Sequence, residues 1–133
     1  MSYSNRYTGA ITITPPVTAA AVIREAPETQ DARLRINRAV TPTDQGEVIV
    51  LTADAIEPAC DGFSGYSLVE DIQRLADHIG SGHTFGGYIE VQWDAGFEDP
   101  VPQRYVIRSG RVETITPRLI WPGEDPDSPP VLT

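Results

Sequence analysis

Three arginines stand close together in the first third of the chain, at Arg33, Arg35 and Arg38. The planar guanidinium group binds carboxylates and phosphates through two parallel hydrogen bonds. If these arginines are not paired with acids inside the fold, they form a small anion-binding face. A nucleotide or a phosphopeptide would suit such a face, with Tyr88 or Trp93 as an aromatic neighbour. Ion pairs with acids on neighbouring strands are the competing prediction, and we favour them.

Cys60, His78 and His83 are the side chains best suited to a soft metal such as zinc, and Asp61 or Asp77 could supply a fourth ligand. Their spacing matches none of the paired patterns that make a zinc site specific. A Cys60–histidine pair would need a third, orienting group before it could act as a nucleophile. We therefore expect no metal, no cofactor and no catalytic residue, with the histidines at a helix end and in the loop after it.

Adjacent acids occur three times, at 70–71, 98–99 and 124–125. Neighbouring residues on a helix do not share a face, and the other two pairs fall in predicted loops, so solvated charge is the favoured interpretation. A glycine-rich run at 80–87 follows a helix instead of preceding one, which is the wrong geometry for cradling a phosphate. We expect a flexible connection there, with a bulge or a close backbone approach at Gly86 and Gly87.

The chain has 133 residues with 19 acidic and 10 basic side chains, a net charge of −9, and every basic residue is arginine. This balance disfavours coating of nucleic acid and docking on anionic lipid. The charge is uneven, because residues 1–43 hold five arginines and three acids whereas residues 44–133 hold five arginines and sixteen acids. A single cysteine excludes an internal disulfide, and no apolar run approaches the ~20 residues of a membrane span. We expect a cytoplasmic protein.

Alternating patterns rich in β-branched residues predict six strands, over residues 7–14, 32–40, 47–56, 84–93, 104–108 and 111–121. Pro15 and Pro16 are expected to end the first strand, because proline cannot donate to a ladder. Pro117 is expected to place the last strand at an edge or to introduce a bulge. The uninterrupted apolar run at 48–51 predicts a central strand that is covered on both faces.

Two helices are predicted between these strands. Thr18 can cap a short, alanine-rich helix over residues 19–26, which Pro27 ends. The second helix follows a capping box of Ser67 and Glu70 and ends at Gly80. It carries one apolar stripe, made of Leu68, Ile72, Leu75 and Ile79.

The element order β-α-β-β-α-β-β-β predicts an α+β fold: one mostly antiparallel sheet of about six strands with two helices on one face. We expect a single domain over residues 1–121. The remaining residues, 122–133, are rich in proline and acids and are predicted to form a solvated tail.

Three segments carry a resemblance to a known family. They are the run from Thr8 to Pro16, the run from Gly82 to Gly87 and the run from Pro117 to Pro122. Together they resemble a family of small uncharacterised proteins from actinobacteria and their phages, a domain of unknown function. One departure is Ala19–Ala21, where the resemblance leads us to expect a tryptophan. The resemblance implies no activity, but it implies an actinobacterial or phage source, and the arginine-only composition fits a GC-rich genome.

We expect a non-enzymatic accessory protein of a phage or an actinobacterium, which acts by binding a host or phage protein. An acidic surface can mimic nucleic acid and occupy the basic groove of a DNA-binding partner, which would suit an anti-defence role. One alternative is a binding protein for a nucleotide signal that uses Arg33, Arg35 and Arg38. Another is a minor structural component of the virion. A homodimer is compatible with each of these.

Overall fold

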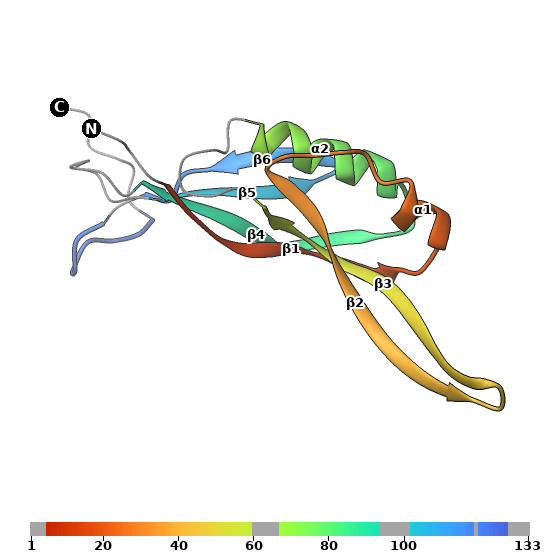
Figure 1. The fold of residues 1–133 in the computed structure, drawn as a ribbon. Helices are drawn as coiled ribbons and strands as arrows, with labels where there is room; N and C mark the ends of the chain where they lie inside the picture. The colour runs from red at the N-terminus through yellow and green to blue at the C-terminus, as the bar shows by residue number, and fades with distance from the viewer. Residues whose placement is uncertain (1–4, 60–66, 94–101, 119, 128–133) are drawn as a thin grey trace.

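Six strands form one sheet, and a helical layer lies on one side of it (Figure 1). The computed structural model describes residues 5–59, 67–93, 102–118 and 120–127. The elements are β1 (Asn5–Val17), α1 (Ala20–Arg24), β2 (Ala32–Thr43), β3 (Gly46–Pro58), α2 (Leu68–Ile79), β4 (Thr84–Trp93), β5 (Gln103–Arg108) and β6 (Arg111–Ile115). The strand order is β2-β3-β1-β4-β5-β6, and each neighbouring pair is antiparallel. The predicted fold class and element order are confirmed.

The core lies between α2 and the sheet. Leu68, Ile72, Leu75 and Ile79 of the helix are all buried, so the predicted apolar stripe is confirmed. From the sheet they meet the inward-facing residues of the central strands, which include Ile11, Ile13, Ile56 and Ile89. Strand alternation places Thr12, Glu90 and Arg104 on the opposite face of the sheet.

The strand β1 runs through Pro15 and Pro16 to Val17, so the prediction that these prolines end it is wrong. Two features of the pairing accommodate them. The ladder with β4 already ends at the pair Thr14–Thr84, so no donor is required there afterwards. The ladder with β3 shifts register between Thr12 and Val17, and such an irregularity is where prolines are tolerated in a sheet.

The first helix is shorter than predicted and spans five residues. Its N-terminal flanking residue is Ala19, and no side chain caps it, so the predicted Thr18 cap is wrong. The helix nevertheless contributes Val22 and Ile23, which pack against the core. Packing therefore stabilises this segment in place of capping, as expected for so short a helix.

The central strands β1 and β4 approach each other unusually closely at two glycines. A Cβ atom built on Gly9 would lie 2.6 Å from the carbonyl oxygen of Tyr88, and one on Gly87 would lie 2.9 Å from that of Ala10. Both glycines also have positive φ, at 85° and 72°. The register of these strands is regular, so close approach and not a bulge explains Gly87.

The predicted hairpin at Ser109 and Gly110 is confirmed. Both turn residues have positive φ, 51° and 77°, as a two-residue turn of the I′ kind requires. The strand β6 lies at the sheet edge but ends at Ile115, before Pro117, so the predicted extension to residue 121 is wrong. A proline has no N–H to continue the ladder. Residues 58–65 are predicted to form a loop, but Pro58 belongs to β3 and most of the others lie outside the described residues, as do most of the acidic loop at 96–102 and residues 128–133.

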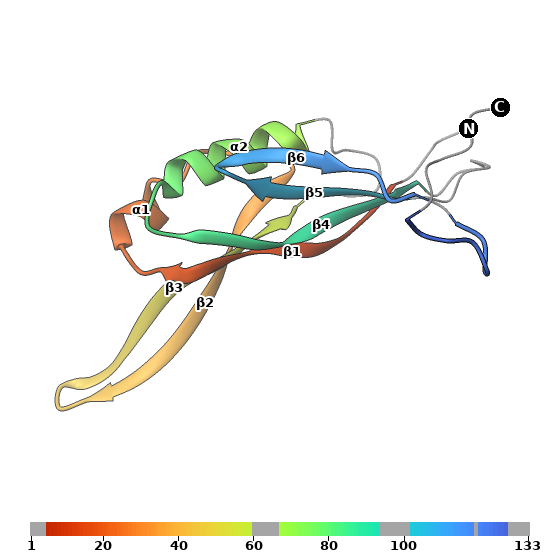
Figure 2. The ribbon, with the colours of Figure 1, turned by 180° about the vertical axis from the view of Figure 1, so that it is seen from behind.

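The hairpin of β2 and β3 continues beyond the helical layer and projects from the body of the protein (Figures 1 and 2). The inner half of β3 is central in the sheet, between β2 and β1. Its outer half holds the apolar run Val48–Leu51, and those four side chains are 43–53% exposed. The prediction that this run is covered on both faces is therefore wrong, because the strands and helices that would cover it do not extend that far.

Candidate functional site

The projecting part of the β2–β3 hairpin is the most unusual surface of the described protein. Every residue from Arg35 to Leu51 is exposed, and we call this stretch the arm. Six of its residues are large aliphatic side chains, each between 41% and 58% exposed: Ile36, Val40, Val48, Ile49, Val50 and Leu51. A two-stranded ribbon without cover is marginally stable in water. A cluster of exposed aliphatic side chains of this kind is typical of an interaction site.

One face of the arm continues the helix-covered face of the sheet, and we call it the helix-side face. The register shifts between Arg35 and Ile36, but Ile36 pairs with Ala53, which is buried in the core, so alternation places Ile36, Arg38, Val40 and Pro42 on this side. The register pairs Ile36 with Ala53, Arg38 with Leu51, Val40 with Ile49, and Pro42 with Glu47. Each of these pairs forms one row across the two strands. The helix-side face is thus an aliphatic strip that also carries one arginine and one glutamate, with the row of Val40 and Ile49 between them.

The opposite face of the arm, the back face, is also partly apolar. Its pairs are Asn37–Thr52, Ala39–Val50 and Thr41–Val48. Val48 and Val50 are 43% and 46% exposed. The arm therefore offers aliphatic side chains on both faces, mixed on this side with threonines and an asparagine. The turn at Asp44 and Gln45 closes it, and the Thr43 hydroxyl donates to the Gly46 carbonyl oxygen at 2.6 Å.

The free edge of the arm is less suited to binding than its faces. The strand β2 is the edge of the sheet and carries three arginines along its length, and Pro42 near the turn has no N–H to offer. Charged residues and proline on an edge strand discourage the addition of another strand. A partner would therefore cover the faces of the arm.

The three arginines predicted to bind an anion do not converge. Arg33 donates to Glu57 at 2.9 Å, and Arg35 holds Asp54 through two hydrogen bonds of 2.9 and 3.3 Å. The bidentate contact from Arg35 lowers the pKa of the Asp54 carboxyl below its usual range. Strand alternation puts Arg38 on the other face of β2. Two of the three charges are thus matched by acids across the sheet, and the anion site remains a prediction.

The aromatic residue proposed beside those arginines also lies elsewhere. Tyr88 is on β4, three places along the sheet from β2. The Arg104 guanidinium lies 4.4 Å from the centre of its ring and also donates to Glu90 at 3.0 Å. The side chain of Trp93 lies outside the described residues. A nucleotide could not contact Arg33 and Tyr88 at once without spanning the intervening strands.

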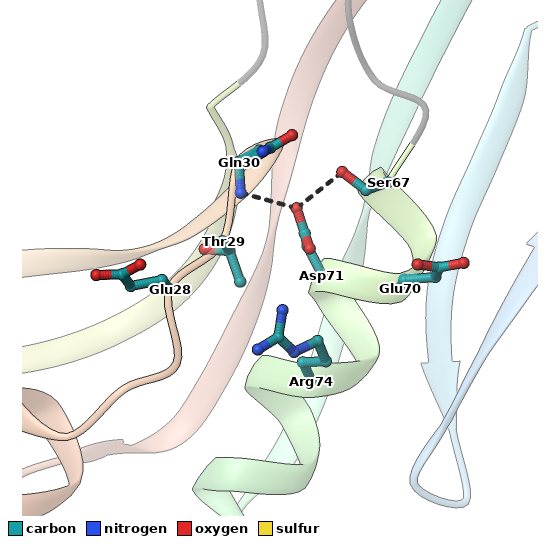
Figure 3. A pocket seen from close by; sticks show the side chains of 7 residues that line it. All are labelled: Glu28, Thr29, Gln30, Ser67, Glu70, Asp71 and Arg74. Carbon is teal, nitrogen blue, oxygen red and sulfur yellow. Dashed lines mark hydrogen bonds between the residues drawn. The ribbon is translucent and has the colours of Figure 1, made fainter.

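A polar cleft of about 550 Å³ lies where the segment before β2 meets the first turns of α2 (Figure 3). Glu28, Thr29 and Gln30 line it from one side. Ser67, Glu70, Asp71 and Arg74 line it from the helix. Three carboxylates and one guanidinium make it acidic overall. This is an open polar groove with no histidine, and its serine hydroxyl is already engaged, as described next.

Two buried aspartates hold this region together. Asp71 accepts hydrogen bonds from the backbone N–H groups of Gln30 and Asp31, at 3.0 and 2.8 Å. Asp31 in turn accepts from both the backbone N–H and the hydroxyl of Ser67, at 2.9 and 2.7 Å. Ser67 is the N-terminal flanking residue of α2, but it makes no side-chain cap, so the predicted capping box is wrong. The hydroxyl bonds Asp31 instead, a long-range contact that local sequence does not reveal.

The histidines and the cysteine do not form a described cluster. His78 lies 2.7 Å from the carbonyl oxygen of Val22 in α1, and His83 lies 2.6 Å from that of Pro15 in β1. Cys60 and Asp61 lie outside the described residues. Among the residues that are described, no group of three or more His, Cys, Asp or Glu could hold a metal ion. Each histidine instead links a backbone carbonyl to a neighbouring element.

These features define a class: a two-layer α+β protein with a projecting, apolar β-arm. The chain belongs to a family of unknown function, DUF6205, whose model matches residues 1–130. Neither the curated proteins nor the solved structures gave a match. Within the described ranges, none of the helices is long and apolar enough to cross a membrane.

Proposed function

We propose that this protein acts by binding another protein through its arm, without catalysing a reaction. The observation that carries the proposal is the run of exposed residues from Arg35 to Leu51, which holds six large aliphatic side chains. Burial of such side chains provides the main driving force of protein association. The polar cleft at the start of α2 is better explained as part of the contacts that attach β2 to the helix.

The apolar arm and the acidic surface predict opposite responses to salt. Docking by the arm is expected to persist at high ionic strength, because apolar burial is not screened. Mimicry of nucleic acid by the acidic surface is a second candidate function, supported by the net charge of −9. Binding of that kind is expected to weaken steeply as salt rises.

The test is capture of partners from a lysate of the cells in which the protein is made, at about 0.1 and about 1 M salt, with Debye lengths of ~10 and ~3 Å. Wild-type protein is compared with the double variant Val48→Ser/Val50→Ser on the back face of the arm. The matched control is Val69→Ser, which changes a 38% exposed valine on α2. We expect a partner that is retained at high salt, retained by the control and lost with the arm variant. A partner set unchanged by the arm variant would contradict the proposal.

The same proposal includes a source and a location. The use of arginine at all ten basic positions supports an origin in a GC-rich genome, and we propose an actinobacterium or one of its phages. We also propose a cytoplasmic location, which is supported by the single cysteine. In that setting the captured partner would be a host protein or another phage protein.

A further inference from the structure

The helix-side face of the arm has a charge pattern that complements itself. Three consecutive rows across the two strands are Arg38–Leu51, Val40–Ile49 and Pro42–Glu47. The central row is aliphatic, and its side chains are 58% and 53% exposed. A positive charge lies one row before it and a negative charge one row after it. Rotation by 180° about the central row exchanges the row of Arg38 with the row of Glu47.

Both charges lack partners within the described part of the chain. The side chains of Arg38 and Glu47 make no hydrogen bond or ion pair with any described residue, whereas those of Arg33 and Arg35 on the same strand are both paired with acids. They cannot pair with each other in one copy. Glu47 lies opposite Pro42, four residues after Arg38, so the two rows are about 13 Å apart at about 3.3 Å per residue. A charge on an aliphatic strip is tolerated in an interface when the opposing surface supplies its opposite.

We propose that two copies of this chain pair through the helix-side faces of their arms, with Arg38 of each copy beside Glu47 of the other. The two-fold axis passes through the row of Val40 and Ile49, which packs against its own counterpart. Such an interface is isologous, because each residue contact occurs twice. The proposal rests on the proposed function, since it names the occupant of one face of the arm and leaves Val48 and Val50 on the back face for a different protein.

The overall charge distribution supports a second copy as the occupant. The arm carries two arginines, Arg35 and Arg38, and two acids, Asp44 and Glu47. Its net charge is therefore zero, so the whole excess of −9 lies outside it. The net negative charge of the rest of the chain disfavours contact between two copies there, whereas the arms can meet without net repulsion. The charged and proline-bearing edge of β2 disfavours the alternative of edge-to-edge strand pairing.

Pairing through one face of a two-stranded arm gives an interface at the small end of the range for specific complexes. We therefore expect a reversible dimer with a dissociation constant of about 1–100 µM. Sedimentation equilibrium on the full chain, from about 1 µM to about 500 µM, covers this range. A wild-type protein that stays monomeric at every concentration would overturn the proposal.

A charge swap tests the geometry. Arg38→Glu alone and Glu47→Arg alone each place like charges together, and each is expected to weaken dimerisation at least tenfold, about 1.4 kcal/mol. The double variant Arg38→Glu/Glu47→Arg restores opposite charges and is expected to return to within about threefold of wild type. Arg108→Glu is the control, because it makes the same charge change on β5 and is expected to leave the dimer intact. A double variant as weak as the single ones would refute the reciprocal contact.

Removal of the aliphatic centre gives an independent readout. Ile49→Ser is expected to abolish the dimer over the same concentration range, whereas Val69→Ser on α2 is expected to leave it unchanged. Circular dichroism and urea unfolding of each variant show whether the fold is retained. If dimerisation fails while capture of a partner still depends on Val48 and Val50, the self-pairing proposal falls and the proposed function stands. If dimers form but capture of a partner does not depend on Val48 and Val50, the proposed function falls and the self-pairing proposal stands.

Discussion

At the residue scale, the buried carboxylate of Asp71 attaches the segment before β2 to the second helix. It is 4% exposed and accepts from two backbone N–H groups. Both donors bond the same oxygen, Oδ2, so Asp71→Asn can keep an acceptor there but removes the negative charge that strengthens both hydrogen bonds. We expect a loss of about 1–3 kcal/mol in the free energy of unfolding. Urea unfolding measures it, with the adjacent exposed Glu70→Gln as control. Equal, small effects in both variants would contradict the assignment.

A second prediction at this scale concerns acid stability. The Arg35 guanidinium lowers the pKa of Asp54, so ionised Asp54 is favoured by folding. The resulting stabilisation is present above the usual aspartate pKa of about 4 and is lost as the pH falls through the lower folded value. Asp54→Asn should therefore reduce stability at pH 6 but differ little from wild type near pH 2. Because the pair lies at the surface, the difference should be small and should shrink in 1 M salt. A difference that is the same at both pH values would contradict this.

At the element scale, the pairing of β1 with β4 depends on glycine. Gly9→Ala would place a Cβ atom 2.6 Å from the Tyr88 carbonyl oxygen and would also strain a φ of 85°. Gly82→Ala makes the same conformational demand, φ 92°, with no atom within 4 Å. We expect a loss of about 1–2 kcal/mol for Gly82→Ala from φ alone. For Gly9→Ala we expect roughly 1–3 kcal/mol more. Thermal or urea unfolding of the two variants compares them, and equal losses would show that the close approach does not matter.

The same scale shows what sequence patterns can predict. Periodicity identified all six strands and α2, because burying one face of each element leaves a local signature at period 2 or 3.6. The ends of the strands are harder to predict from the sequence. The length of β1, for example, depends on whether a neighbouring strand requires a backbone donor at Pro15 and Pro16. The local pattern predicts that the Ser67 hydroxyl caps its own helix, but this hydroxyl donates to Asp31, 36 residues away. Such contacts depend on tertiary placement, which local pattern does not encode.

At the scale of the whole molecule, the apolar run at Val48–Leu51 shows how a correct physical inference can lead to a wrong structural one. Continuous aliphatic side chains do indicate cover on both faces. The described residues of one copy give the arm no such cover. The pattern is consistent with cover supplied by other molecules. The candidate site was therefore present in the sequence as a strand signal, and only the topology showed that the strand leaves the body of the protein.

Because every residue of the arm is exposed, the body should fold without it. Thr43 and Gly46 flank the present two-residue turn, and Asn37 and Thr52 form an equivalent pair six residues earlier on β2, because the ladder repeats every two residues. A two-residue Asn-Gly turn can therefore replace residues 38–51 and preserve the hairpin register. We expect the unfolding free energy in urea to stay within about 1 kcal/mol of wild type, as for exposed substitutions away from the core. A loss of several kcal/mol would show that the arm belongs to the folding unit. If the shortened protein is stable but neither dimerises nor captures a partner, the arm is required for both kinds of binding and is not required for folding.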